Sequence, residues 1–308
     1  MSESASPLPW TGNKGCIYST IDAFIPPHRV YIEPCMGSAE VFFRKPPAEK
    51  EILNDYNGDL VNFFRVLQDM DKLTFLLGRL ALSINSEEQF RRNRELLNSV
   101  PNVLDDISET GEIIAKLSWN DVQLAAAFYE NQVYSYASTG KSFAIVQRDM
   151  RQRLDRLYKA HGRLCNAVIL HRDYREVIRY AAGKDTFILL DPPYKGTENY
   201  YKKSNFDSDD HEKLFDFMAE IDKQFHGECK FLITYNNCDF IRELAEKHGF
   251  DTYVQPRLHN MVQITRPGEQ FEELLIGNYP LLQQAEINNK YLPLNISQMS
   301  LFDFHYDY

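Results

Sequence analysis

The segment FILLDPPY, residues 187–194, joins an apolar run to an acid, two prolines and an aromatic ring. The apolar run predicts a buried strand, and the prolines end the strand and stiffen the chain that leaves it. At the carboxyl end of a parallel strand, this order places the Asp191 carboxylate and the Tyr194 ring in the crevice where α/β proteins bind ligands. The alternative is that Asp and Pro merely terminate a strand, because short motifs also arise by chance.

A second strand end carries different groups. In VYIEPCMGSAEVFF, residues 30–43, a strand runs into Glu33 and Pro34, and a turn of small residues follows around Gly37 and Ser38. Small residues after a first strand let a ligand approach the backbone closely. With one glycine this is not a GxGxxG sequence, so the motif alone is a weak indication of a ligand site.

The third strand end is EILNDYNGDLVNFF, residues 51–64, in which a short strand stops at Asn54 and Asp55 before a helix. Asp55 follows Gly37 by 18 residues, about the separation at which doubly wound folds bind ribose hydroxyls. The alternative is an ordinary helix cap, a position where Asp and Asn are common.

The elements that must position these groups alternate along the chain. Short apolar runs predict strands and helical periodicity fills several gaps between them, which indicates a largely parallel sheet covered on both faces. The strands are expected at 29–32, 51–53, 167–170, 186–190, 230–235, 252–254 and 273–276, and the helices at 14–24, 57–68, 209–225 and 239–248. Residues 71–165 interrupt the alternation with helical patterns at 86–98, 121–131 and 148–164, which predicts a helical insertion.

Composition excludes several classes of protein. Hydrophobic residues make up 44% of the 308 residues and charged residues 25%, which is typical of a globular chain. No apolar run approaches the roughly 20 residues of a membrane-spanning helix, and the amino terminus lacks a secretory signal. Five cysteines without a CxxC pair fit neither a disulfide framework nor a zinc cluster, so we expect reduced thiols and a cytoplasmic location. The net charge of -10 argues against a protein that coats nucleic acid nonspecifically.

Taken together and in order, these motifs resemble the Dam-like, D12-class DNA adenine N6 methyltransferases. The family order is W-x-G-x-K, EPF-x-G, LND, a variable recognition region, and DPPY. The matching residues here are Trp10, Gly12 and Lys14; Glu33, Pro34 and Gly37; Leu53, Asn54 and Asp55; and Asp191, Pro192, Pro193 and Tyr194. The resemblance extends to about residue 280, and the ordered set is far more specific than any one motif.

The resemblance implies a Rossmann-like, S-adenosylmethionine-dependent methyltransferase fold with a mostly parallel seven-strand sheet. The catalytic domain would comprise residues 1–70 and 166–308, with a target-recognition insertion at 71–165 and a tail at 285–308. The family uses S-adenosylmethionine, whose sulfonium is already activated, so no metal is expected. The implied substrate is adenine N6 in duplex DNA, and the base would be flipped out of the helix.

The family also implies roles for individual residues. The catalytic residues would be those of the DPPY segment, Asp191, Pro192, Pro193 and Tyr194. Asp191 and the Pro192 carbonyl would accept hydrogen bonds from the adenine amine, and Tyr194 would stack on the base. The cofactor would be held by Trp10, Gly12, Lys14, Glu33, Pro34, Gly37, Ser38, Asp55 and Asp173. In this set Asp55 would bind the ribose and Asp173 would lie near the cofactor adenine, although a helix cap is nearly as good an explanation of Asp173.

Four residues depart from the family pattern. Cys35 stands where Phe is usual, Ala39 where a second Gly is common, and Glu40 where a small residue is common. We therefore expect the turn to hold the methionine part of the cofactor somewhat differently. Gln132 replaces an arginine often found after the asparagine at this place, so a GATC specificity cannot be carried over.

A local excess of basic residues is the candidate DNA contact. Residues 141–163 hold seven basic and two acidic residues, net +5 in an acidic protein. A solvated helix face is the alternative, but this stretch closes the insertion that the family uses for recognition, and phosphate contacts need a local basic cluster. The candidate DNA-binding residues are Asn131, Lys141, Arg148, Arg151, Arg153 and Arg156.

The end of the chain carries one more pattern. QMSLF, Gln298 to Phe302, is similar to the QLSLF-type peptide with which bacterial DNA enzymes bind the sliding clamp. The alternative is a segment that packs on the protein's own sheet.

Two rival functions also stay open. One is N4-cytosine methylation, because the cytosine amine is also an exocyclic amine beside an sp2 nitrogen. The other is a catalytically silent DNA-binding protein of the same fold. The resemblance suits a bacterial or a phage-encoded protein.

Overall fold

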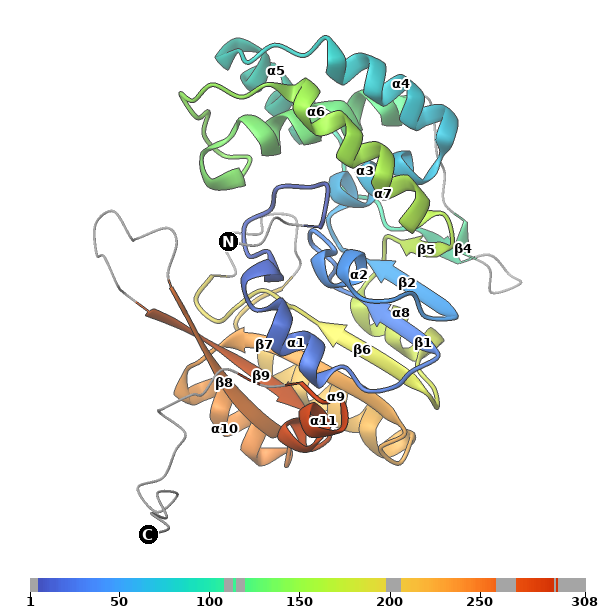
Figure 1. Cartoon of the computed structure of the whole chain (residues 1–308), viewed down its shortest axis with the longest axis vertical. Coiled ribbons are helices and arrows are strands. Elements are labelled where there is room, and N and C mark those ends of the chain that lie inside the picture. Colours follow the sequence, from blue (N-terminus) through green and yellow to red (C-terminus); the bar gives the residue numbers. More distant parts are fainter. Residues whose placement is uncertain are drawn as a thin grey trace.

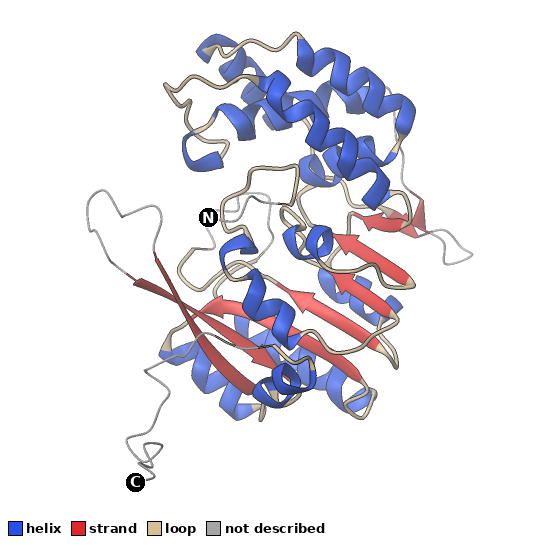
Figure 2. Cartoon of the chain, in the orientation of Figure 1, coloured by secondary structure: helices blue, strands red, loops and turns tan. Residues whose placement is uncertain are grey.

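The computed structural model describes residues 5–107, 113 and 114, 120–197, 206–258, 270–290 and 292. Seven strands form one sheet in the order β5-β2-β1-β6-β7-β9-β8 (Figures 1 and 2). They are β1 (Val30–Glu33), β2 (Lys50–Asn54), β5 (Ala167–Leu170), β6 (Thr186–Leu190), β7 (Cys229–Asn236), β8 (Asp251–Leu258) and β9 (Gln270–Gly277). A second, two-stranded sheet pairs β3 (Asp106–Ile107) with β4 (Ile113–Ile114).

Strand direction confirms the predicted sheet. Every neighbouring pair from β5 to β7 is parallel, whereas β9 is antiparallel to both β7 and β8. The arrowheads of β2, β5 and β6 point to the same side in Figure 2, so the residues that follow these strands gather along one edge. This is the α/β, Rossmann-like arrangement expected from the sequence.

Helices cover both faces of the sheet. They are α1 (Tyr18–Phe24), α2 (Glu40–Arg44), α3 (Gly58–Gln68), α4 (Met70–Ala81), α5 (Glu87–Ser99), α6 (Asn120–Tyr134), α7 (Leu154–Leu164), α8 (Tyr174–Ala181), α9 (Asp210–Gln224), α10 (Asp239–Lys247) and α11 (Leu281–Ile287). Short 3-10 helices are η1 (Lys14–Cys16), η2 (Tyr136–Ser138) and η3 (Met150–Arg153). Because side chains alternate across a strand, Phe187 and Leu189 face one core cluster, with α1, α2 and α3, and Ile188 and Leu190 face another, with α8, α9 and α10.

The helical segment between β2 and β5 stands above the sheet in Figure 1 and shares its core. The cluster on the α3 face of the sheet continues without a break into α4, α6 and α7. Within it, the rings of Phe63 on α3 and Tyr129 on α6 stack at 5.2 Å, with an angle of 5° between their planes. The helices at the end of the insertion are therefore fixed to the sheet through α3.

Several elements differ from the expectation: α11 and the pair β3 and β4 were not predicted, and three further differences concern helices before and within the insertion. The helix expected at 14–24 is divided into η1 and α1, and the helix expected at 148–164 begins as η3 at Met150, where the Asp149 side chain caps the turn by accepting from the Arg151 N–H. Helix α4, residues 70–81, was not predicted. Only Asp69, whose carboxylate caps α4, separates α4 from α3. The apolar patterns of the two helices are therefore continuous in the sequence.

Candidate active site

The motifs identified in the sequence meet around one cavity. The cavity lies at the carboxyl ends of β1, β6 and β7, three adjacent strands, and is closed by the amino-terminal segment before η1. Its lining residues are Trp10, Gly12, Asn13, Lys14, Glu33, Met36, Gly37, Ser38, Glu40, Val41, Leu189, Asp191 and Thr234. Most of the predicted cofactor residues and the predicted catalytic acid therefore face the same space.

Asp191, directly after β6, is held through both carboxylate oxygens. Oδ2 lies 2.5 Å from the Lys14 Nζ, and Oδ1 accepts a hydrogen bond of 2.6 Å from the Thr234 hydroxyl. Lys14 Nζ also donates to the Gly12 carbonyl at 2.8 Å. The lysine side chain is 7% exposed and that of Asp191 is 27% exposed, so the carboxylate remains open on the cavity side while its buried cation fixes it from behind.

Tyr194, at the end of the DPPY segment, lies beside the same lysine. Lys14 Nζ is 5.1 Å from the centroid of the ring, and the tyrosine hydroxyl donates a hydrogen bond to the carboxylate of Glu273 on β9. Of the two prolines between Asp191 and Tyr194, Pro192 is buried and Pro193 is partly buried. Sequence reasoning missed Thr234 and Glu273 as site residues, although both lie in late strands that resemble the family.

Glu33, the last residue of β1, is buried at the floor of the cavity. It accepts a hydrogen bond of 2.8 Å from the Tyr31 hydroxyl. Burial raises its pKa to about 8, and the nearby Asp191 carboxylate acts in the same direction. A cationic group bound beside Glu33 would therefore favour the ionised form of this acid and lower its pKa.

The turn after β1 depends on Gly37. Its φ is +47°, in the region that favours glycine, and a Cβ atom at this position would lie 3.0 Å from Trp10 Nε1. The Gly37 N–H donates to Asp55 Oδ2 at 3.0 Å, and the Asn57 N–H donates to the other oxygen at 2.9 Å. Burial raises the pKa of Asp55 to about 6 in spite of these hydrogen bonds. Asp55 thus fixes the glycine turn, and its contact with a ribose stays a prediction.

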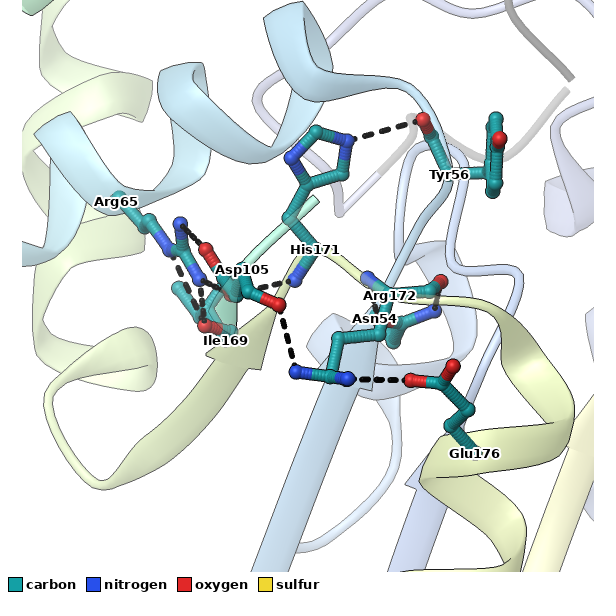
Figure 3. A network of polar contacts seen from close by, with 8 residues as sticks. All are labelled: Asn54, Tyr56, Arg65, Asp105, Ile169, His171, Arg172 and Glu176. Carbon is teal, nitrogen blue, oxygen red and sulfur yellow. Dashed lines mark hydrogen bonds and ion pairs between the residues drawn. The ribbon is translucent and has the colours of Figure 1, made fainter. Parts of the chain in front are cut away.

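A polar network behind the cavity fixes the end of β2 (Figure 3). The Asn54 side chain donates to the Pro34 carbonyl at 2.8 Å and to the Arg172 carbonyl at 3.0 Å, and it accepts from the Arg172 N–H at 2.9 Å. The Arg65 guanidinium binds Asp105 and the Ile169 carbonyl. These contacts tie β2 to the glycine turn and to β5, so Asp55 stands on a rigid support.

Asp173 is a helix cap, as the alternative explanation of this residue predicted. Its side chain caps α8 by accepting from the Arg175 N–H at 2.9 Å, and it forms an ion pair with the Arg175 guanidinium at 2.8 Å. Burial alone would raise the pKa of Asp173, but the hydrogen bonds from Arg175 outweigh it and lower the pKa. Asp173 is not among the residues that line the cavity, and its contact with a cofactor adenine stays a prediction.

The departures from the family pattern have structural roles. Ala39 has a φ of 54° at the residue before α2, a conformation that a glycine adopts without strain. Burial raises the pKa of the Cys35 thiol, and the surrounding carboxylates, Asp55 first, raise it further, so this thiol stays neutral among acids. Glu40, 2% exposed, accepts hydrogen bonds from the N–H groups of Ala5 and Ser6, both at 3.0 Å.

Glu40 also binds the segment that carries Lys14. Its Oε2 accepts from the Asn13 side chain at 3.0 Å, and its Oε1 lies 2.5 Å from the Arg44 Nε. One buried carboxylate therefore holds the amino-terminal segment against the glycine turn. Glu40 therefore helps to position the cavity wall.

The predicted DNA-binding residues differ in exposure. Asn131 is buried, at 3% exposed, and the Arg148 guanidinium donates to the carbonyls of Val133 and Ser135, so Arg148 supports the loop after α6. Lys141 and Arg151 are exposed, and the partly buried Arg153 lies at the Tyr129 hydroxyl. The sixth, Arg156 on α7, is also partly buried.

One hydrogen bond joins this loop to the cavity wall. The Thr11 hydroxyl, between Trp10 and Gly12, donates to the Ala137 carbonyl in η2 at 2.8 Å. In Figure 1 the loop after α6 descends toward the amino-terminal segment on the side where the parallel strands end. The loop and the candidate active site therefore share one side of the molecule.

Within the described part of the chain, none of the helices is both long and apolar enough to cross a membrane. Over the same residues, no three or more His, Cys, Asp or Glu side chains gather in a way that could hold a metal ion.

Comparison with known proteins places the chain. It is 27% identical over 259 residues to the DNA N-6-adenine-methyltransferase of Escherichia phage P1, and the match covers 78% of this chain and 31% of that protein. The chain thus spans about a third of the phage protein's length. It is 22% identical to the type II methyltransferase M1.LlaDCHI of Lactococcus lactis subsp. cremoris, over 70% of this chain and 76% of that one.

Another relative is matched almost from end to end. The type II methyltransferase M.CviBI of Paramecium bursaria Chlorella virus NC1A is 21% identical over 281 residues, which cover 88% of this chain and 98% of that protein. A sequence model of one family matches residues 10–261, a range that includes every strand end around the cavity. The chain belongs to the D12 class N6 adenine-specific DNA methyltransferase family.

Proposed function

We propose that this chain transfers the methyl group of S-adenosylmethionine to N6 of an adenine in duplex DNA, at a specific sequence, with the base flipped out of the helix. The observation that carries the proposal is the Asp191 carboxylate, fixed by Lys14 and Thr234 and open toward a cavity that Glu33 and Gly37 also line. The family to which the chain belongs is adenine-specific, and its match includes Asp191.

The cavity suits the cofactor in charge. S-adenosylmethionine supplies a methyl group on a positively charged sulfonium and carries an ammonium group as well. Glu33 is a buried acid on the cavity floor, and Gly37 lacks the Cβ atom that would lie 3.0 Å from Trp10 Nε1, so the indole packs directly against the turn. The residues that would hold the cofactor are Trp10, Gly12, Lys14, Glu33, Pro34, Gly37 and Ser38, with Asp55 and Asp173 at its nucleoside end.

Asp191 addresses the main chemical difficulty, which is the weak nucleophilicity of the adenine amine. Its lone pair is delocalised into the ring. Hydrogen bonds from the amine to Asp191 and to the Pro192 carbonyl favour a pyramidal nitrogen with a localised lone pair. A carboxylate has about four acceptor sites, so Asp191 accepts the amine while it keeps Lys14 and Thr234.

Reaching the amine requires the base to leave the duplex. Unstacking and unpairing one base costs a few kcal/mol, which contacts in the pocket must offset. Tyr194 is the ring placed to stack on the base, and stacking on an aromatic side chain contributes about 1 to 3 kcal/mol. Tyr194 and Asp191 would therefore act on the same base, one on its face and one on its edge.

Cofactor affinity is expected to rise with pH because of Glu33. The pKa of Glu33 is about 8 in the folded chain against an ordinary 4.5, so the folded state holds an extra proton in this window and its stability falls as pH rises through it. A cationic cofactor favours the ionised acid, so S-adenosylmethionine should bind more tightly at pH 8 than at pH 6 and release a proton on binding. Calorimetry in buffers of different ionisation enthalpy measures both effects.

Glu33→Gln is the matched control for this pH dependence. It keeps the shape and an acceptor for Tyr31 but does not titrate, so its affinity should be lower and nearly independent of pH apart from the cofactor's own ionisation. A wild-type affinity that does not change between pH 6 and 8 would show that Glu33 does not face the charged part of the cofactor.

For DNA recognition, we propose the insertion at residues 71–165, within a catalytic domain of 1–70 and 166–308. Arg151 is the best residue for a test of phosphate contact because its side chain is 73% exposed. Its ion pair with Asp149 lies at the surface and contributes little to the stability of the fold. Arg151→Ala should weaken binding alike for all sequences and reduce the slope of log affinity against log salt by about 0.9. Fluorescence anisotropy at several salt concentrations measures it.

Lys184→Ala is the charge-matched control for Arg151→Ala. Lys184 is 66% exposed and lies before β6, at the end of the sheet away from the cavity. Its removal changes the net charge equally and should leave the slope unchanged. Equal slopes for Arg151→Ala and the wild type would assign Arg151 to a merely solvated face, and Lys141 would be the next candidate.

Expression in a host that lacks adenine methylation, followed by sequencing of modified bases, tests the proposed function. Methylated adenines within one short sequence are expected, and that sequence gives the specificity. Modified cytosines would support the N4-cytosine alternative, and unmodified DNA with retained DNA binding would support a silent protein of this fold.

We further propose a cytoplasmic location and keep the sliding clamp as a candidate partner. The peptide Gln298 to Phe302 lies outside the described residues, so its support is the QMSLF sequence alone. Deletion of residues 297–308 should abolish binding to the bacterial clamp in a pull-down and leave methylation in the absence of the clamp unchanged.

A further inference from the structure

A buried acid on β9 contacts the tyrosine of the DPPY segment. Glu273 is fully buried, at 0% exposed, and its carboxylate accepts a hydrogen bond from the Tyr194 hydroxyl. A fully buried glutamate is rare unless it is hydrogen-bonded or paired, because an ionised carboxylate loses its hydration in the interior. On the sheet, Glu273 lies opposite Asn236, two residues after Thr234, the residue that binds Asp191.

Other contacts of Tyr194 restrain its ring and its backbone. Its carbonyl accepts hydrogen bonds from the Thr197 N–H at 2.9 Å and from the Thr197 hydroxyl at 3.0 Å. The ring of Phe271 is nearly parallel to that of Tyr194, at 3° and 6.5 Å, and the ring of Tyr235 is tilted by 35° at 5.9 Å. The hydroxyl is the atom farthest from the backbone, so the acceptor that holds it decides where the ring points.

We infer that Glu273 is a positioning residue for base capture: it acts through the Tyr194 hydroxyl and holds the ring at the place where the flipped adenine stacks on it. The inference rests on the proposed function, since it gives Tyr194 the stacking role. Glu273 itself would not contact the reacting atoms. It contacts the tyrosine hydroxyl and does not line the cavity around Asp191. A hydrogen bond to a carboxylate is about twice as strong as one between neutral groups, which suits an anchor.

Four variants test the inference: Tyr194→Phe, Glu273→Leu, their combination, and Glu273→Gln. Tyr194→Phe removes the donor and keeps the ring, and Glu273→Leu removes the acceptor at similar volume. Each should slow single-turnover methylation by about 10- to 100-fold, the effect of losing a hydrogen bond to a charged group. Each should also reduce the fluorescence rise of a 2-aminopurine placed at the target adenine, which reports the flipped base directly.

The combined variant and the conservative variant separate positioning from a structural role. If Glu273 acts through the hydroxyl, the combined variant is no slower than either single one. Glu273→Gln keeps an acceptor oxygen and should retain most of the rate and of the fluorescence. Cofactor affinity, measured by calorimetry without DNA, should stay at the wild-type value in all four, since none of these changes touches Glu33 or Gly37.

Two results would overturn the inference. One is a folded Glu273→Leu variant with the wild-type rate and fluorescence; the other is a combined variant whose loss is the product of the two single losses. If Glu273→Leu does not fold, Glu273→Gln in the Tyr194→Phe background decides, because a further loss there shows that Glu273 acts independently of the hydroxyl. A wild-type protein that methylates no adenine would instead refute the proposed function itself.

Discussion

Replacing Asp191 with asparagine will slow methyl transfer by about 100- to 1,000-fold, the usual cost of removing one group that stabilises a transition state electrostatically. Asparagine keeps the shape of the side chain and one acceptor oxygen. Lys14 and Thr234 lie against different oxygens of Asp191, so the single amide oxygen will accept from Lys14 and the NH2 will face the Thr234 hydroxyl, which can accept. The neutral amide therefore offers the adenine amine neither the charge nor as many acceptor sites as the carboxylate. Single-turnover assays at saturating cofactor and DNA measure the loss.

Asparagine is a better test here than alanine because of the buried cation. Lys14 is 7% exposed, and Asp191→Ala would leave its ammonium without the carboxylate, which costs stability as well as activity. The matched control is Asp185→Asn, the same change at an exposed acid one residue before β6 begins. Asp185→Asn should retain the wild-type rate. If Asp191→Asn also retains it, Asp191 does not act on the amine.

Gly37→Val will weaken the binding of S-adenosylmethionine by about 100-fold or more. Two effects combine: a β-branched residue is strained at a φ of +47°, and its Cβ would lie 3.0 Å from Trp10 Nε1. Strain at such a position and overpacking each cost about 1 to 3 kcal/mol. Relief of the strain would move the Gly37 N–H away from Asp55 and change the turn on which the cavity depends. Calorimetric titration of the DNA-free protein measures the affinity.

Gly78→Val is the control for Gly37→Val. Gly78 lies in α4, and a Cβ atom placed there has no neighbour within 4 Å. Valine has a better helix propensity than glycine, so this variant should keep both stability and affinity. A Gly37→Val protein that binds the cofactor as tightly as Gly78→Val does would show that the glycine turn is not part of the cofactor site.

The strand ends were predictable from the sequence because their signals are local. Asp191 follows FILL, Glu33 follows VYI and Asp55 follows EILN, so in each case one short segment carries both the strand and the residue at its carboxyl end. Parallel pairing then brings these ends together, which is a property of the sheet and not of any one segment. The motif residues around the cavity were identified for this reason.

Contacts between distant segments were not predictable. Thr234 reaches Asp191 because β6 and β7 pair parallel, and Glu273 reaches Tyr194 because β9 pairs antiparallel with β7 in one register. A shift of β9 by one residue would turn Glu273 to the other face of the sheet. Arg148 was predicted as a phosphate contact from its charge, and the sequence did not show that its guanidinium also binds carbonyls of Val133 and Ser135. Its contact with DNA stays a prediction. A sequence gives the charge of a side chain, but it does not give the residue that the side chain contacts in the fold.

The most direct test of the proposed function is the chemical identity of the product. Purified protein is incubated with duplex DNA that contains its recognition sequence and with S-adenosylmethionine labelled in the methyl group, and the DNA is digested to nucleosides for mass spectrometry. The proposed function predicts label in N6-methyladenine and in no other nucleoside, with initial incorporation lower by about 100-fold or more in the Asp191→Asn reaction. Label in N4-methylcytosine, or unlabelled DNA from a folded protein that binds the cofactor, would contradict it.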